Sequence, residues 1–283
     1  MLEIIDIKHY VVILSALLVW IVLFFVRRTL IRRQSTTTMT KGIHIGNGQS
    51  VGRREEQDDY FSSSTTSVGT LAVIADGISG LSNGRMASTL AVTLFSKEFL
   101  LLEKTEDFTD YFSKAATQSN SGILANLSGS NGGTTLVAAI VSSGVLHWAA
   151  VGDSMITVFR DGEFISMNSK HTVETLLREQ VLSGQITKEE AEASPVRKHL
   201  VNYLGYEGFS SMEMGEPFTL RKHDKIMLAS DGIYDALSEV ELEQLIKQKK
   251  PVEDIADDII EQVDVKGLRN QDNATVIILE KGW

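Results

Sequence analysis

Aspartates at the ends of apolar runs are the residues of this chain best suited to chemistry. Four of them border runs typical of buried strands: Asp76, Asp153, Asp231 and Asp272. A fifth, Asp58, follows a charged stretch that begins at Arg53. A carboxylate at a strand end is held in place, and several that converge form an oxygen-only site for hard divalent cations. The pattern therefore favours a metal-dependent site.

Each aspartate also has an ordinary structural interpretation. Asp followed by Gly is a common turn pair, and Asp161-Gly162 is interpreted as a turn only. An Asp that caps the following helix explains any one strand-end position equally well. Burying the end of an apolar strand nevertheless costs free energy unless the carboxylate is paired or binds a metal. Only the aspartates taken together favour a metal site over turns and caps.

The composition excludes several classes of site. The chain has 283 residues, enough for one large domain or two small ones, and its 43% hydrophobic content is not typical of disorder. The absence of cysteine excludes disulfides, thiolate zinc sites and cysteine nucleophiles. A net charge of −10 argues against nucleic acid as a main partner. The acidity lies in residues 43–283, which hold 21 Lys and Arg against 35 Asp and Glu.

An apolar run near the N-terminus predicts a membrane anchor. Residues 11–26 contain no charged side chain, and the run extends back to Ile4 if Asp6 and Lys8 are included. About 20 residues span a bilayer, so a single tilted helix is expected to contact the lipid bilayer through residues 4–26. The positive-inside rule then places the rest of the chain in the cytoplasm, because four arginines follow the run: Arg27, Arg28, Arg32 and Arg33.

The main competing interpretation of this run is a buried core helix. A cleaved signal peptide fits less well, because the leading flank is acidic and no small-residue cleavage site follows. The polar segment after the arginines is typical of a linker. We therefore expect a single-pass protein of the cell membrane with an anchor over residues 1–27, a linker over 28–42 and a globular domain over 43–283.

The globular part mixes strands and helices. The expected strands cover residues 43–47, 58–62, 69–75, 134–141, 144–151, 155–160, 212–217, 224–229 and 274–280. The expected helices cover residues 84–103, 108–127, 172–183, 188–193, 238–248 and 251–263, and Thr187 forms a capping box with Glu190. Consecutive strands joined by tight turns, with helices arriving in pairs, indicate mainly antiparallel sheets with helices outside them. The fold class is therefore α+β.

Seven segments around the aspartates form an ordered set. They are Arg53-Arg54-Glu55-Glu56-Gln57-Asp58, Ala75-Asp76-Gly77-Ile78-Ser79-Gly80, Gly132-Gly133-Thr134-Thr135, Val151-Gly152-Asp153-Ser154, residues 182–191, Ser230-Asp231-Gly232 and Asp272-Asn273-Ala274-Thr275. In this order they resemble the motifs of the metal-dependent type 2C (PPM) serine/threonine protein phosphatases, of bacterial type. The first segment is similar to the family motif Arg-x-x-Asn-Glu-Asp. The resemblance covers about residues 43–283.

The fold implied by this resemblance is a four-layer α/β/β/α sandwich of two mainly antiparallel sheets, here preceded by one transmembrane helix. The activity implied is hydrolysis of phosphoserine and phosphothreonine by a water activated between two divalent metals, Mn²⁺ or Mg²⁺. By position, Asp76 would bridge both metals and the carbonyl of Gly77 would bind one. Asp231 and Asp272 would complete the other.

Three further roles follow from the same resemblance. Asp58 would support the metals through water or hydrogen bonds, and Asp153 matches the acidic residue of a third, weaker metal site. Arg53 matches the arginine that holds the substrate phosphate, with two donors that suit two phosphate oxygens. Arg54 is interpreted as its solvated neighbour, and His199 as an ordinary strand or surface residue. The implied partners are Ser/Thr-phosphorylated proteins, with a membrane Ser/Thr kinase and its substrates as candidates.

The chain departs from the family pattern at several positions. Glu56-Gln57 stands where the motif has Asn-Glu, and Met155 replaces an arginine that usually follows Gly-Asp-Ser. Ile78 replaces a histidine common in eukaryotic members, so no general acid is assigned. These departures support one alternative function, a catalytically weakened regulatory or binding protein with the same fold.

Overall fold

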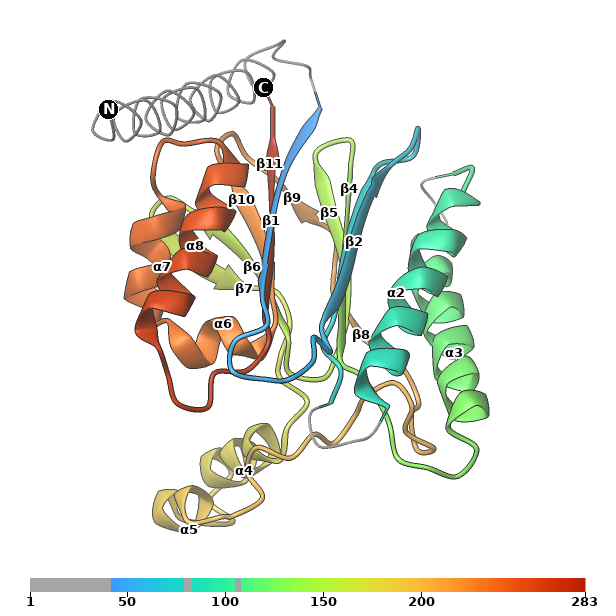
Figure 1. Ribbon diagram of the computed structural model, residues 1–283, viewed down its shortest axis with the longest axis vertical. Helices are drawn as coiled ribbons and strands as arrows, with labels where there is room; N and C mark the ends of the chain where they lie inside the picture. The colour runs from blue at the N-terminus through green and yellow to red at the C-terminus, as the bar shows by residue number, and fades with distance from the viewer. Residues whose placement is uncertain (1–41, 79–82, 105–107, 283) are drawn as a thin grey trace, which may run out of the picture. The chain divides into compact units, whose positions relative to one another are not determined.

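Two antiparallel sheets face each other in the computed structural model, which describes residues 42–283 except 79–82, 105–107 and 283. The first sheet has the order β1 (Ile43–Ser50), β11 (Ala274–Lys281), β10 (Lys225–Ala229), β6 (Met155–Arg160), β7 (Glu163–Ser166). The second has the order β2 (Tyr60–Thr65), β3 (Thr70–Ala75), β4 (Leu136–Ser142), β5 (Val145–Val151), β8 (Glu213–Met214), and β9 (Phe218–Thr219) also pairs with β5. Figure 1 shows the two sheets side by side.

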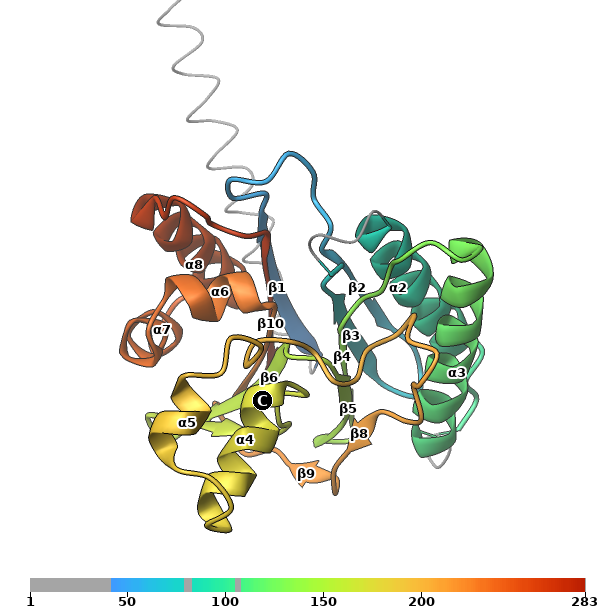
Figure 2. The same ribbon diagram turned by 90° about the horizontal axis from the view of Figure 1, so that it is seen from below.

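Helices cover the outer face of each sheet. On the first sheet lie α6 (Asp231–Ala236), α7 (Glu239–Ile246) and α8 (Val252–Lys266), and on the second lie α2 (Gly84–Leu100) and α3 (Phe108–Leu127) (Figure 2). The expected α+β sandwich of four layers is therefore confirmed for the described residues. The predicted anchor, residues 1–27, and nearly all of the predicted linker, 28–42, lie outside the described residues. Within the described part, no helix has the length and apolar character needed to cross a membrane.

Three buried clusters hold the four layers together. One lies between α2, α3 and the second sheet, another between the first sheet and α6, α7 and α8, and the third between the two sheets. The central strands β3, β4 and β10 are buried at every position, which requires apolar side chains on both faces. That is why their sequences are nearly continuous apolar runs without alternation.

The strand registers bring distant segments to one end of the sandwich. Ala229 of β10 lies opposite Val276 of β11, so the chain after β10 and the chain before β11 meet at that end. Ser50 of β1 lies opposite Ala274, so the loop after β1 leaves at the same end. In the second sheet Tyr60 lies opposite Ala75, which puts the residues before β2 beside those after β3. We call this the catalytic end.

A helical excursion leaves the sandwich near the catalytic end. It contains α4 (Val173–Leu182) and α5 (Lys188–Glu192), neither of which has a buried residue (Figure 2). The predicted capping box is confirmed, because Thr187 Oγ1 accepts from Glu190 N at 3.1 Å and Glu190 Oε2 accepts from Thr187 N at 2.8 Å. Its two ends are joined by a hydrogen bond from Val173 N to His199 O of 2.9 Å. This excursion includes residues 182–191, one of the seven segments of the ordered set, and we call it the flap.

Candidate active site

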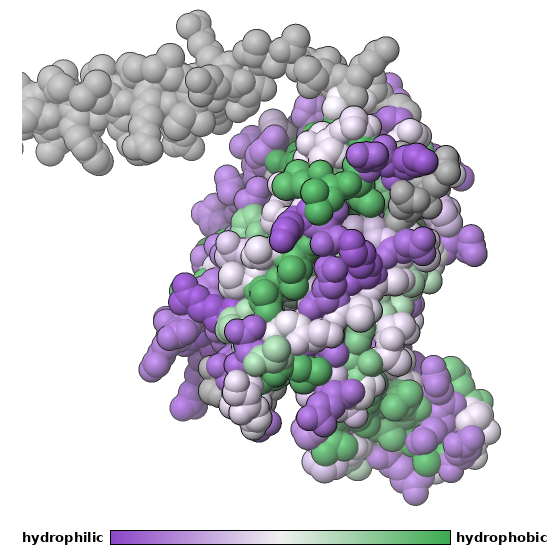
Figure 3. Space-filling model, turned by 90° about the vertical axis from the view of Figure 1, so that its right-hand side faces the viewer, coloured by the Kyte–Doolittle hydropathy of each residue, from purple (hydrophilic) through white to green (hydrophobic). Residues whose placement is uncertain are grey.

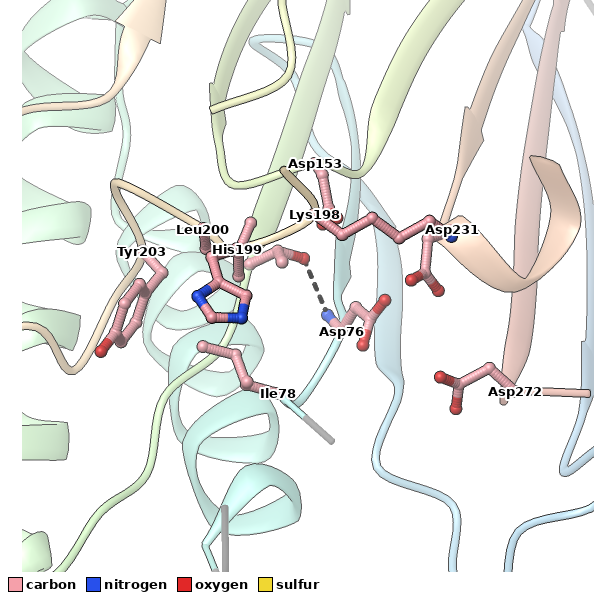
Figure 4. Close-up of a pocket in the computed structure, with 10 residues that line it drawn as sticks. Asp76, Ile78, Asp153, Lys198, His199, Leu200, Tyr203, Asp231 and Asp272 are labelled. Atoms are coloured by element: carbon pink, nitrogen blue, oxygen red, sulfur yellow. Dashed lines mark hydrogen bonds between the residues drawn. The ribbon is translucent and has the colours of Figure 1, made fainter. Parts of the chain in front are cut away.

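A cavity of about 430 Å³ lies at the catalytic end. Its lining includes four predicted aspartates together with residues that follow the flap: Asp76, Ile78, Thr135, Asp153, Lys198, His199, Leu200, Tyr203, Asp231 and Asp272. Figure 4 shows the carboxylates of Asp76, Asp231 and Asp272 pointing toward a common space. The structure therefore brings together the aspartates that the strand-end pattern selected.

The backbone of Asp76 is fixed by the Gly-Gly-Thr-Thr segment. Thr134 Oγ1 and Thr135 N donate to the carbonyl of Asp76, at 2.8 and 2.9 Å. Asp76 N in turn donates to Thr135 Oγ1 at 3.3 Å, the bond drawn in Figure 4. Thr135 Oγ1 also lies 2.8 Å from Ser154 Oγ, next to Asp153. The two threonines thus tie the Asp76 segment to the Asp153 segment.

Glycines allow the aspartate segments to approach one another. A Cβ on Gly77 would collide with the backbone of Gly84, at the start of α2, and with the carbonyl of Asp58. A Cβ on Gly232 would collide with the carbonyl of Asn273. The glycines that follow Asp76 and Asp231 are therefore required by packing, independently of any metal.

Asp59, which the sequence analysis did not select, is the more deeply placed of two adjacent aspartates. It is buried, and its Oδ2 accepts from Ser230 Oγ at 2.8 Å and from Thr275 Oγ1 at 2.7 Å. Its Oδ1 is buried without a hydrogen-bond partner among the described residues. Asp58 is only half-buried and does not line the cavity.

Arg54, rather than Arg53, reaches the site. Arg54 Nη2 donates to Asp272 Oδ2 at 2.7 Å, whereas Arg53 is exposed and its backbone N donates to Gln271 O at 2.9 Å. The earlier interpretation of Arg54 as a solvated neighbour is therefore incomplete. Moving the family motif by one residue, to 54–59, places its arginine at Arg54 and its aspartate at Asp59.

The side chain of Asn273 holds this loop in register. Its Nδ2 donates to Val51 O at 2.9 Å and to Glu56 O at 3.0 Å, while its Oδ1 accepts from Asp58 N at 2.7 Å. The Asp-Asn pair before β11 therefore positions both Asp272 and the loop that presents Arg54 and Asp59.

The carboxyl groups of the site repel one another. Burial and the neighbouring Asp59, Asp231, Asp153 and Asp272 raise the pKa of Asp76 well above its ordinary value. Burial, followed by Asp153 and Asp272, raises the pKa of Asp231 to about 7. Burial raises the pKa of Asp59 to about 6, although hydrogen bonds from Thr275 and Ser230 oppose the increase. Burial is the largest cause of each shift, and repulsion between the carboxylates adds to it.

These donors fit divalent cations by chemistry, with one geometric condition. Clustered carboxylate oxygens are the ligands of Mg²⁺ and Mn²⁺, and positive charge would relieve their repulsion. Among the described residues, however, no three carboxylate or imidazole groups stand where they could bind one ion together. Binding of one ion by three of these groups therefore requires side-chain rotations.

The metal-free protein is expected to be more stable in mildly acidic than in mildly alkaline solution. The folded-state pKa of Asp59 is about 6 and that of Asp231 about 7, against 3.8 for an unperturbed Asp. The folded state therefore binds more protons between pH 4 and 7, and its unfolding free energy falls as the pH rises through that window. Thermal unfolding with a chelator should give a Tm several degrees higher at pH 5 than at pH 8. A Tm that rises over this range would contradict the repulsion.

The flap contributes residues that the sequence analysis missed. Lys198, His199 and Tyr203 line the cavity, and Lys198 Nζ lies 3.1 Å from Asp235 Oδ2. No local pattern marks these residues, because only the return of the chain from the flap brings them to the site. His171, beside the cavity, accepts from Gly152 N at 3.3 Å and supports the loop before Asp153.

The sequence matches the model of a known family. The family model for protein phosphatase 2C matches residues 45–274. The chain belongs to the protein phosphatase 2C family. This result confirms the resemblance inferred from the ordered motifs, and the expected function class with it.

Bacterial serine/threonine phosphatases are among the relatives of this protein phosphatase 2C chain. It is 31% identical over 219 residues to the serine/threonine phosphatase Stp of Listeria innocua, covering 75% of this chain and 84% of the relative. Protein phosphatase PhpP of Streptococcus pneumoniae is 27% identical over 234 residues, covering 80% and 92%.

Solved structures agree with the fold. The S. agalactiae serine/threonine phosphatase has a TM-score of 0.74 at 26% identity, covering 84% of this chain and 99% of that one. The catalytic domain of the phosphatase PstP in complex with two manganese ions has a TM-score of 0.67 at 25% identity, covering 84% and 97%.

Proposed function

We propose that this chain hydrolyses phosphoserine and phosphothreonine in proteins with the help of Mn²⁺ or Mg²⁺. The carboxylate cluster at the catalytic end supports this most directly, because Asp76, Asp153, Asp231 and Asp272 line one cavity and a bound cation would offset the burial and repulsion that raise the pKa values of Asp76 and Asp231. The two manganese ions bound by PstP further support it. The metals would supply Lewis-acid stabilisation of the phosphoryl group and activation of the attacking water.

Four carboxylates are assigned to the metals in this proposal: Asp59, Asp76, Asp231 and Asp272. The carbonyl of Gly77 remains a candidate ligand, as the resemblance implied. Asp153 lines the same cavity and remains the candidate for a third, weaker site. In this proposal Asp58 supports the site through its backbone only. Its N–H donates to Asn273 Oδ1, and its carbonyl accepts from Gly77 N.

Phosphate recognition is assigned to Arg54, although the sequence analysis predicted Arg53. The Arg54 guanidinium already lies at Asp272, so a modest rotation would turn its donors toward a phosphate in the cavity. Arg54→Ala should lower kcat/KM for a phosphothreonine peptide by about 10- to 100-fold, the loss expected for charge-assisted hydrogen bonds. Arg53→Ala should leave kcat/KM within about twofold. Steady-state kinetics of both variants would measure these effects. A larger loss of kcat/KM for Arg53→Ala than for Arg54→Ala would support the motif register predicted from the sequence.

The proposed activity is tested by phosphate release from phosphothreonine and phosphoserine peptides. We expect the full chain to release inorganic phosphate when Mn²⁺ or Mg²⁺ is added. Phosphate release should stop when a chelator is present. Metal binding without phosphate release would instead favour the alternative of a catalytically weakened binding protein.

We also propose a single-pass anchor in the cell membrane over residues 4–26, with the phosphatase domain in the cytoplasm. Its support is the uncharged run at residues 11–26 and the arginines that follow it. A membrane Ser/Thr kinase and its substrates are then candidate partners. Fractionation of cells that express the full chain tests the anchor: extraction only by detergent supports it, and release by carbonate or salt argues against it.

A further inference from the structure

A second, basic cavity of about 800 Å³ lies on the first sheet. Six Lys and Arg residues line it against three acids, in a chain whose net charge is −10. The cations are Arg221, Lys222, Lys225, Lys247, Lys249 and Lys250, and the acids are Asp161, Asp224 and Glu280. They come from the β6–β7 turn, the loop before β10, the segment after α7 and the end of β11. Four separate segments thus contribute to one positively charged surface.

Internal partners account for only part of this charge. Asp224 is buried and binds Arg160, whose Nη2 lies 2.5 Å away, so it offers little to the lining cations. Lys225 is also buried, and its Nζ donates to Ile246 O at 2.6 Å, at the end of α7. Three exposed cations form no ion pair with any described residue: Lys222, Lys247 and Lys249.

Lysines after a helix often serve only to balance the helix dipole. This role accounts for Lys247 and Lys249, which follow the C-terminal end of α7. Lys225 Nζ also donates to the carbonyl of Ile246, the last residue of that helix. It does not account for Lys222, which comes from the loop before β10 and faces the same cavity beside Arg221, whose Nη1 lies 3.6 Å from Asp161 Oδ2. The convergence of two basic segments therefore indicates a surface suited to an external anion.

This surface lies at the end of the sandwich opposite the catalytic cavity. Lys225 begins β10, and Asp231 follows its other end, roughly 20 Å away for six residues of extended chain. The register of the first sheet also places the start of β1 at the basic end, since Ile43 lies opposite Lys281 and Lys225 lies opposite Glu280. The chain therefore enters the domain beside the basic cavity.

Exposed leucines lie at the same end of the molecule. Helix α2 begins at Gly84, in contact with Gly77 at the catalytic end, and its 17 residues extend roughly 25 Å away. Its last residue, Leu100, is 61% exposed, and Leu101 is 65% exposed. Figure 3 shows one hydrophobic patch in the upper part of the α2–α3 face, with other patches further down the same view. Exposed apolar side chains near a basic surface are typical of contact with a bilayer interface.

We propose that this basic end of the phosphatase domain docks on the anionic surface of the bilayer, an inference that rests on the proposed anchor. Only residues 28–42 separate the proposed anchor from the start of β1, so β1 begins a short length of chain away from the headgroups. Anionic lipids then attract the basic cavity, and the exposed leucines meet the interface. Docking in this way orients the catalytic cavity toward the cytoplasm, where phosphorylated segments can reach it.

Lysine acetylation of the full chain in vesicles tests this docking. The chain is reconstituted in vesicles of phosphatidylcholine alone or with about 30% phosphatidylglycerol, treated with an amine-reactive acetylating reagent and examined by peptide mass spectrometry. We expect Lys222, Lys247 and Lys249 to react at least fivefold more slowly in anionic vesicles, an effect that about 0.5 M salt removes. Lys188, on the flap, should react equally in both.

Two triple variants provide matched controls. The first variant combines Lys222→Gln, Lys247→Gln and Lys249→Gln. In this variant Lys250 should be acetylated at the same rate in anionic vesicles as in phosphatidylcholine vesicles. The same charge change on the flap, at Arg178, Lys188 and Arg197, should leave it unchanged. Both sets are exposed, and phosphatase activity on a soluble peptide confirms that each variant is folded.

The outcomes separate docking from the anchor. Slower acetylation restricted to anionic vesicles supports the proposal, and equal rates in both compositions for vesicle-bound protein overturn it. If the full chain does not float with phosphatidylcholine vesicles, the anchor is wrong. Salt-sensitive flotation with anionic vesicles would then support the basic surface, and its absence would overturn it. If a phosphothreonine peptide slows acetylation of these lysines and anionic lipid does not, the proposal is also overturned. The surface would then be assigned to a protein ligand.

Discussion

Asp59→Asn is expected to lower metal-dependent phosphatase activity by at least about 100-fold, while Asp58→Asn retains activity within about fivefold. Asp59 is buried beside Asp76 with one carboxylate oxygen unpartnered among the described residues, and Asp58 does not line the cavity. Loss of a metal ligand removes several kcal/mol of transition-state stabilisation, and each 1.36 kcal/mol is tenfold in rate. The same substitution at two adjacent aspartates is therefore expected to change activity by very different factors.

The measurement is kcat/KM for a phosphothreonine peptide at saturating Mn²⁺, with circular dichroism to confirm folding. Asn at position 59 keeps the shape of the side chain and can still accept from Ser230 and Thr275, so the variant should fold. A larger loss of kcat/KM for Asp58→Asn than for Asp59→Asn would contradict this assignment. It would support the motif register predicted from the sequence, which places the functional aspartate at Asp58.

Asp231→Asn is expected to lower activity by about 1,000-fold and yet raise the stability of the metal-free protein. The pKa of Asp231 is about 7 because burial, Asp153 and Asp272 disfavour its ionised form. Since the folded-state pKa lies above the unfolded value, ionisation near neutral pH destabilises the fold, and a neutral amide removes that cost. The gain should be on the order of 1–3 kcal/mol, or several degrees in Tm.

Thermal unfolding at pH 7.5 with a chelator, and again with Mn²⁺, measures both effects. The wild type should gain stability from Mn²⁺, and Asp231→Asn should gain much less. Asp257→Asn, an exposed position on α8, is the matched control and should behave as the wild type. A metal-free Asp231→Asn variant that is less stable than the wild type would contradict the repulsion among the carboxylates.

Much of the fold followed from the sequence because its central strands are buried on both faces. The apolar runs of β3, β4 and β10 lie within one or two residues of their predicted bounds. Short elements were missed: α6 has six residues and β7 four, too few for a periodic pattern. The strand expected at residues 212–217 is only the two-residue β8, and a second two-residue strand, β9, follows it at Phe218–Thr219.

The site was predictable where an aspartate ends a long apolar run. Asp76, Asp153, Asp231 and Asp272 all line the cavity, as the strand-end pattern predicted. The first motif was ambiguous because both its arginine and its aspartate are doubled, so two registers have the same spacing. Burial, which the sequence does not display, distinguishes them.

Residues that converge through long-range topology were beyond sequence reasoning. Lys198, His199 and Tyr203 reach the cavity only because the flap returns there. The basic segments at residues 221–225 and 247–250 are visible in the sequence as charge runs, but the net charge of −10 gives no sign that they share one surface.

Calorimetric titration of Mn²⁺ into the wild type and Asp76→Asn tests the central claim most directly, because Asp76 lies among all the other carboxylates of the site. The account predicts that the wild type binds about two Mn²⁺ per chain, as PstP does, and that the variant, shown to be folded, binds at least about tenfold more weakly. A wild type that binds no Mn²⁺, or a variant that binds it equally well, would contradict the account.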